Sequence, residues 1–116
     1  MAEQSTIARP YAKAIYAMAC QSDQILVWSL VLEVLSITVS DPLVSVKIDD
    51  PVVSDSQLQA FLLDIIQDCL DLTGDPIKSR VEKTVALLIQ WHRLPIIKDI
   101  YHLYQGLLVQ SEGLKQ

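Results

Sequence analysis

The sequence predicts an all-α protein, a single-domain bundle of six helices of which one is short. Apolar residues recur at intervals of three and four along most of its 116 residues, which is the period of amphipathic helices. Three of its five prolines directly follow an aspartate, a pair that marks helix boundaries. No glycine-rich linker interrupts the chain, and its length is enough to bury one core without disulfides or metals.

The first predicted helix carries more apolar surface than one core contact needs. Its sequence IARPYAKAIYAMA, residues 7–19, is apolar or small at nearly every position. One stripe is expected to face the core, and a neighbouring stripe is left over. The core stripe consists of Ala8, Ala12, Ile15 and Ala19, and the second stripe consists of Ile7, Tyr11, Ala14 and Met18.

The second predicted helix follows Ser22-Asp23, which we expect to cap it, and runs to about Val39. Its apolar run ILVWSLVLEVLSITV, residues 25–39, has the β-branched content of a strand, but its length favours a helix and no second strand is available to pair with it. The run is also shorter than the roughly 20 residues of a membrane-spanning helix, and Glu33 lies in its middle. We therefore interpret it as a buried core helix.

Polar caps mark the next two helices. Asp41 is the expected cap of a short third helix with Pro42 at its first position, and DDP at 49–51 ends that helix. Ser54 with Gln57 three residues later predicts a capping box at the start of the fourth helix. The apolar face of the fourth helix consists of Leu58, Phe61, Leu62, Ile65, Ile66, Cys69 and Leu70.

Breakers separate the last helices. Gly74 is expected to end the fourth helix, Asp75 to cap the fifth and Pro76 to open it, and Pro95 is expected to open the sixth. The core stripe of the fifth helix consists of Ile77, Val81, Val85 and Leu88, with Ala86, Leu87, Ile89 and Trp91 lying off it. The stripe of the sixth consists of Ile96, Ile97, Ile100, Leu103, Tyr104, Leu107 and Leu108, with Gly113 near its end.

The charges and the reactive side chains exclude several classes of function. A net charge of −5 argues against nucleic-acid binding. Eight aspartates between residues 41 and 75 face only one lysine there, which predicts a solvated acidic flank or, alternatively, a surface that orients a partner. Cys20 and Cys69 lack a CxxC spacing and are expected to be buried, reduced thiols. His92 and His102 are expected at the surface. With no phosphate loop, GxSxG motif or metal-ligand spacing, we predict a non-enzyme without a cofactor or metal.

The surplus apolar faces of the first and fifth helices suggest that the two helices share a groove. Small residues such as Ala14 would let a further helix approach closely, which is the helix-in-groove mode of recognition. The second stripe of the first helix would then be covered by a helix of another protein.

Several stretches resemble the N-terminal domain of the F-type ATP synthase δ subunit, whose mitochondrial counterpart is the oligomycin-sensitivity-conferring protein. They are ARPYAKAIYAMA at 8–19, Trp28 in the next helix, SDPLV at 40–44 and RL at 93–94. The resemblance implies a six-helix bundle on top of the catalytic head, where a groove beside the first and fifth helices holds the N-terminal helix of an α subunit. The expected binding residues are Ile7, Tyr11, Ala14, Met18, Trp28, Lys83, Leu87 and Trp91.

The resemblance also implies a static, non-catalytic role in proton-driven ATP synthesis, in which the subunit ties the head to the peripheral stalk. It implies residues 1–110 as the bundle and 111–116 as a tail toward a C-terminal segment, absent here, that meets the b subunits. The expected location is peripheral, on the cytoplasmic face of a bacterial inner membrane without insertion, and the isolated domain is expected to be a monomer. The alternative is a helical interaction module that self-associates through the same groove.

One departure from the family pattern concerns the end of the fifth helix. This chain has QWHRL at 90–94 where family members usually have ENGRL. Without that glycine, His92 is expected to take the left-handed conformation itself. Trp91 places a large aromatic side chain at the lower edge of the expected groove.

Overall fold

The computed structural model of the chain describes residues 2–72 and 77–115, and these residues form six α-helices and one 3-10 turn with no strand. The prediction of an all-α bundle is confirmed. The elements are α1 (Ala2–Gln21), α2 (Ile25–Ser40), α3 (Pro42–Asp49), α4 (Asp55–Cys69), α5 (Ile77–Gln90), the 3-10 turn η1 (Leu94–Ile96) and α6 (Ile97–Lys115). The expected break and cap at Gly74, Asp75 and Pro76 lie outside the described residues.

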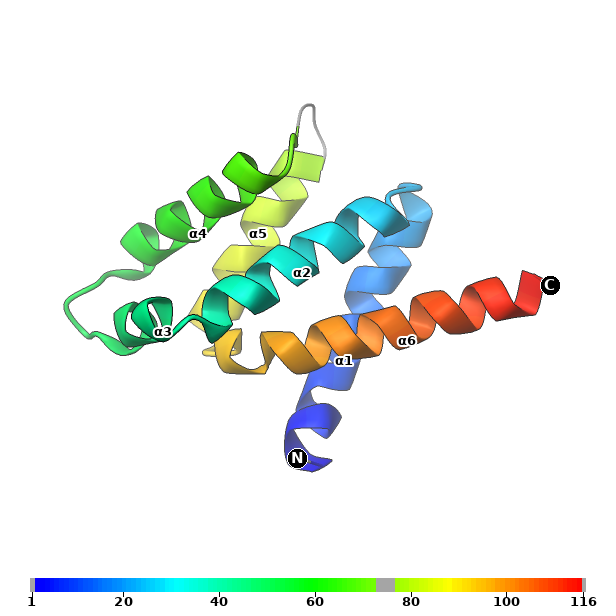
Figure 1. The fold of residues 1–116 in the computed structure, drawn as a ribbon, viewed down its shortest axis with the longest axis horizontal. Helices are drawn as coiled ribbons and strands as arrows, with labels where there is room; N and C mark the ends of the chain where they lie inside the picture. The colour runs from blue at the N-terminus through cyan, green and yellow to red at the C-terminus, as the bar shows by residue number, and fades with distance from the viewer. Residues whose placement is uncertain (1, 73–76, 116) are drawn as a thin grey trace.

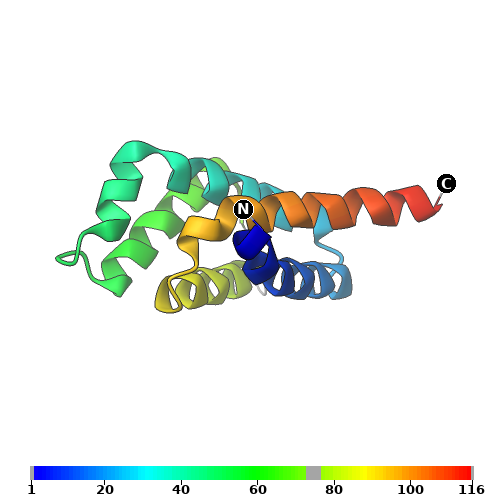
Figure 2. The same ribbon diagram turned by 90° about the horizontal axis from the view of Figure 1, so that it is seen from below.

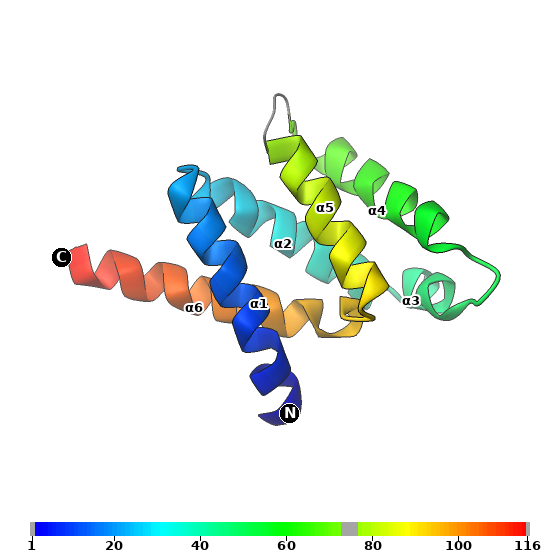
Figure 3. The same ribbon diagram turned by 180° about the vertical axis from the view of Figure 1, so that it is seen from behind.

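The helices are arranged in layers (Figure 1). Seen from behind, α1 and α5 lie on the same face of the molecule, and α2 and α6 run behind them (Figure 3). The view from below shows the same two layers edge-on (Figure 2). The most extensive packing joins α1 and α2 to α6, and joins α4 to α5, while α3 attaches to α2.

The core is built on the stripes that the helical period predicts for α1 and α5. The four predicted core residues of α1 and the four of α5 are all buried. Ile89 is also buried, at 5 % exposed, so its placement off the core stripe was wrong. It lies one residue past Leu88, and the packing of α5 on α4 widens the buried face of α5.

A group of aromatic side chains anchors α6 to α1 and α2. Tyr104 is fully buried, and its hydroxyl donates a 2.5 Å hydrogen bond to the carbonyl oxygen of Ile25. Its ring meets that of Tyr16 edge to face, with the centroids 5.6 Å apart. Burial raises the pKa of Tyr104, so this hydroxyl stays a neutral donor.

The predicted caps of α3 and α4 are present. The side chain of Asp41 accepts a 2.8 Å hydrogen bond from the backbone N–H of Leu43. Ser54 and Gln57 form both bonds of a capping box, at 3.2 and 2.9 Å. Pro95, expected to open the last helix, lies instead inside η1, and α6 begins at Ile97 and continues to Lys115.

The predicted cap of α2 was wrong. The N-cap of α2 is Gln24, with no side-chain hydrogen bond, and Ser22 Oγ donates back to the carbonyl of Met18 at 3.0 Å. Asp23 has a φ of 57°, the left-handed conformation that ends a helix. Serine and aspartate are found both at the start of a helix and in the turn after its end. Here Ser22 and Asp23 close α1 instead of starting α2.

The same closure ends α5, as expected for His92, whose φ is 56°. Its N–H donates to the carbonyl of Ile89, and the N–H of Arg93 donates to that of Leu88, the two bonds of a Schellman motif. Asp23 and Gln24 make the equivalent pair with Cys20 and Ala19. The two helices that were expected to share a groove, α1 and α5, therefore end in the same type of turn. Neither turn contains a glycine.

The expected burial of the two cysteines was wrong, because both are exposed and free. The buried stripe of α4 is narrower than predicted and consists of Leu58, Leu62 and Ile66. Cys69 is the last residue of α4, and Cys20 lies in the last turn of α1, directly after the buried Ala19.

No described helix is by itself long and apolar enough to cross a membrane. By length and composition α2 and α3 meet that criterion only together, and they are bent by 83° relative to each other.

Candidate functional site

A groove of about 510 Å³ lies between α1 and α5. The two helices run in opposite directions along it (Figure 3). Its lining is apolar except for the hydroxyls of a tyrosine and a threonine and the indole N–H of a tryptophan. The lining residues are Pro10, Tyr11, Ala14, Ile15 and Met18 from α1, with Thr84, Leu87, Leu88 and Trp91 from α5 and the residue that follows it.

The groove has a buried floor and exposed walls. Ile15 and Leu88 are 6 and 1 % exposed and belong to the core as well as to the floor. Leu87 and Trp91 are 46 and 52 % exposed, and Ala14 is exposed on the opposite wall. Apolar side chains that remain open to water in a concave surface mark a site for another apolar surface.

Thr84 contributes no free donor to the groove. Its hydroxyl donates a 2.8 Å hydrogen bond to the carbonyl of Arg80 in the preceding turn of α5. Its methyl group is left as the surface that it can offer to a ligand. The groove can therefore recognise an apolar face by shape, with few polar groups to fix a small polar molecule.

Three side chains close the end of the groove that lies where α5 ends. The rings of Tyr11 and Trp91 meet edge to face, with centroids 6.4 Å apart and an interplanar angle of 69°. The guanidinium Nε of Arg93 donates to the Tyr11 hydroxyl at 3.3 Å. Trp91 and Arg93 flank His92, whose left-handed conformation turns the chain at the end of α5. The turn that caps α5 therefore also carries the two residues that contact Tyr11 at the edge of the groove.

Five of the eight residues predicted for this site line the groove: Tyr11, Ala14, Met18, Leu87 and Trp91. Ile7 is 38 % exposed one turn before Tyr11 but is not part of the lining. Lys83 is exposed on α5, one turn before Leu87, and does not line it either.

Trp28 does not reach the groove, contrary to expectation. It is 0 % exposed and belongs to the core stripe of α2 with Val31, Leu32 and Leu35. Because α2 lies in the layer behind α1 and α5, a partner in the groove cannot contact this indole directly (Figure 3).

Pro10 and Thr84 also line the groove and were not predicted, and Ile15 and Leu88 were assigned to the core alone. Helical spacing holds the signal for both missed residues, since Pro10 lies four residues before Ala14 and Thr84 lies three before Leu87.

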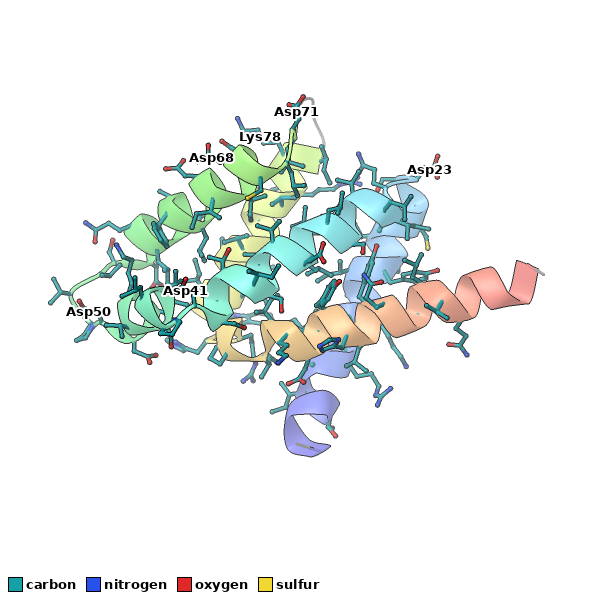
Figure 4. The ribbon with its side chains drawn as sticks, viewed as in Figure 1. Asp23, Asp41, Asp50, Asp68, Asp71 and Lys78 are labelled. Atoms are coloured by element: carbon teal, nitrogen blue, oxygen red, sulfur yellow. The ribbon has the colours of Figure 1, made fainter. Side chains whose placement is uncertain are left out.

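The acidic flank lies elsewhere, around α3 and α4. Figure 4 shows Asp41 and Asp50 at the two ends of α3, and Asp68 and Asp71 at the end of α4 near Lys78 of α5. All the aspartates between residues 41 and 71 are exposed. Within the described residues, no group of three histidine, cysteine, aspartate or glutamate side chains could hold a metal ion.

Comparisons with known proteins identify relatives over nearly the whole chain. A family model described as ATP synthase delta (OSCP) subunit matches residues 7–116. ATP synthase subunit delta of Coxiella burnetii (strain RSA 331 / Henzerling II) is 33 % identical over 114 residues, which is 98 % of this chain and 62 % of that protein. The subunits of the same name from Alkalilimnicola ehrlichii and Methylobacillus flagellatus are 35 and 31 % identical, and each alignment covers 98 % of this chain and 60 % of the relative. The chain thus spans about three fifths of the length of these relatives.

Proposed function

We propose that this chain, which belongs to the ATP synthase delta (OSCP) subunit family, is a non-catalytic stator adaptor of an F-type ATP synthase. In this role it holds the catalytic head to the peripheral stalk, so that rotation of the central shaft drives ATP synthesis instead of turning the head. Its relatives are ATP synthase subunits, and a stator needs binding surfaces and no reacting groups.

The finer proposal is that the groove between α1 and α5 binds the N-terminal helix of an α subunit. The observation that carries it is the open apolar groove, whose walls are two helices and whose size suits the apolar stripe of a third. Ala14, opposite Leu87, leaves room for the backbone of the incoming helix. Tyr11 and Trp91 offer large, rigid surfaces of the kind that dominate binding energy at protein interfaces.

We assign attachment to the b subunits to the segment of the longer relatives that lies outside the region matched by this chain. The relatives are longer than the matched region, which leaves a further segment in them for this contact. The proposed location is peripheral, at the cytoplasmic face of a bacterial inner membrane, and the proposed state of the chain alone is a monomer.

The test is isothermal titration calorimetry of the chain with a synthetic peptide corresponding to the N-terminal helix of an α subunit. The titration is carried out at low and at high ionic strength. Saturable binding that changes little with salt is expected, because an apolar groove releases or screens few counterions. Sedimentation without peptide checks the alternative. No binding, together with concentration-dependent self-association, would favour a self-associating module instead.

A further inference from the structure

A second hollow, of about 260 Å³, lies where α1 crosses α6. It opens on the flank of α1 toward α6, whereas the groove described above opens toward α5. Figures 1 and 3 show the two helices crossing at this point from opposite sides. Its lining combines an apolar floor of Ala12, Leu103 and Leu107 with an exposed basic rim of Arg9, Lys13 and His102.

The rim stands out against the charge of the molecule. The chain as a whole carries −5, yet among the side chains that the structure describes no carboxylate lines this hollow. Arg9 and Lys13 lie four residues apart on one face of α1, and His102 comes from the facing side of α6. The like charges of Arg9 and Lys13 gain nothing from each other, so an anionic group placed between them would interact favourably with both.

Gly106 keeps the hollow open. It lies inside α6, where glycine weakens a helix relative to alanine. Packing does not require it, because a Cβ added there meets nothing within 4 Å. Residue 106 is part of the lining, so any larger side chain at this position would enter the hollow.

We infer that this hollow binds a short acidic segment of a partner protein, with one aliphatic side chain on the floor beside Gly106 and carboxylates reaching Arg9 and Lys13. The volume is below the roughly 300 Å³ of small-molecule pockets and far below what a whole helix needs, but it accepts a side chain. The exposed aspartates of the acidic flank disfavour an extended anionic surface such as a membrane, whereas a short segment contacts only the rim. The inference does not depend on the proposed function of the groove.

The test uses a short blocked helical peptide with leucine on one face and glutamate on the other, titrated into the isotope-labelled chain by NMR. Amide shifts are expected around residues 9–13 of α1 and 102–110 of α6. Changing Arg9 and Lys13 together to glutamate should weaken binding about tenfold or more. Gly106→Leu, which fills the hollow without changing its charge, should weaken it to a similar extent.

Matched controls distinguish binding in the hollow from non-specific attraction between the charges of the peptide and those of the protein. Lys78→Glu makes a charge reversal on α5, away from the crossing of α1 and α6, and should leave binding unchanged. The same peptide with lysine in place of glutamate should not bind at this site. Circular dichroism confirms that each variant is folded.

Three outcomes would overturn the inference. The first is shifts confined to the groove residues 84–91. The second is an equal loss of binding in the Lys78 and the Arg9/Lys13 variants. The third is binding to phosphatidylserine vesicles that requires Arg9 and Lys13 while the acidic peptide does not bind.

Discussion

Replacing Leu87 with aspartate should weaken binding of an α-subunit helix about a hundredfold or more while leaving the bundle folded. In the free protein Leu87 is 46 % exposed, so the new carboxylate stays in water. The cost to stability is the loss of the half of Leu87 that is buried in the free protein, about 1 kcal/mol, and the lower helix propensity of aspartate, about 0.5 kcal/mol. In the complex an incoming helix covers this wall of the groove, and the carboxylate has no partner among the lining residues.

The loss of binding has two parts. Covering the exposed half of a leucine contributes about 1 kcal/mol, half of the value for full burial. Leaving a charge desolvated and unpaired costs about 2–5 kcal/mol. The sum is about 3 kcal/mol or more, which corresponds to roughly a hundredfold or larger increase in Kd. Leu87→Ala removes only the first part, so it should raise Kd by about fivefold.

Isothermal titration with the α-subunit peptide measures both variants, and thermal denaturation followed by circular dichroism measures their folding. Ala14→Asp, on the opposite wall, should behave like Leu87→Asp. The reasoning would be refuted if Leu87→Asp bound as tightly as Leu87→Ala, because the residue would then remain in water in the complex. It would equally be refuted if the aspartate variants unfolded while their folded fraction still bound the peptide normally.

The remaining predictions concern the cap of α5, a helix glycine and the tryptophans. Tryptophan emission should change when the peptide binds, and this change should disappear in Trp91→Phe because Trp28 is buried away from the groove; a persisting change would place Trp28 near the ligand. His92→Gly should stabilise the protein by about 1 kcal/mol in urea unfolding, since glycine adopts a φ of 56° without the cost that a side chain imposes. Asp23→Gly is the matched control and should gain less, because aspartate tolerates this conformation better. Gly106→Ala should also stabilise the protein, by about 1 kcal/mol, as its new Cβ meets nothing; a destabilised variant would reveal a contact at this position.

Patterns local to one helix could be predicted from the sequence, and associations between distant segments could not. The buried stripes of α1 and α5 follow from the helical period, and the left-handed His92 follows from the absence of glycine. Trp28 was assigned to the groove through the family resemblance, although its spacing to Leu32 and Leu35 already fits a core stripe. The basic hollow required the structure, because only the crossing of the helices brings His102 to α1.

Ser22-Asp23 and Cys69 show a second limit. Serine and aspartate can start a helix or follow its end, and here Asp23 takes the left-handed conformation that ends α1 while Gln24 is the N-cap of α2. Cys69 continues the apolar period of α4 but is exposed, although Leu70, the next residue, packs against the core. Periodicity indicates which face of a helix is apolar and does not indicate which residues of that face its neighbours cover.

The two walls of the groove belong to different packing units. α1 packs mainly on α6, and α5 packs mainly on α4, with α2 joining the two units from behind. The width of the groove is therefore set by how the units sit against each other more than by direct contact between α1 and α5. A helix seated between them bridges both units, so its binding should slow hydrogen exchange in α4, which it does not touch, as well as in α1 and α5.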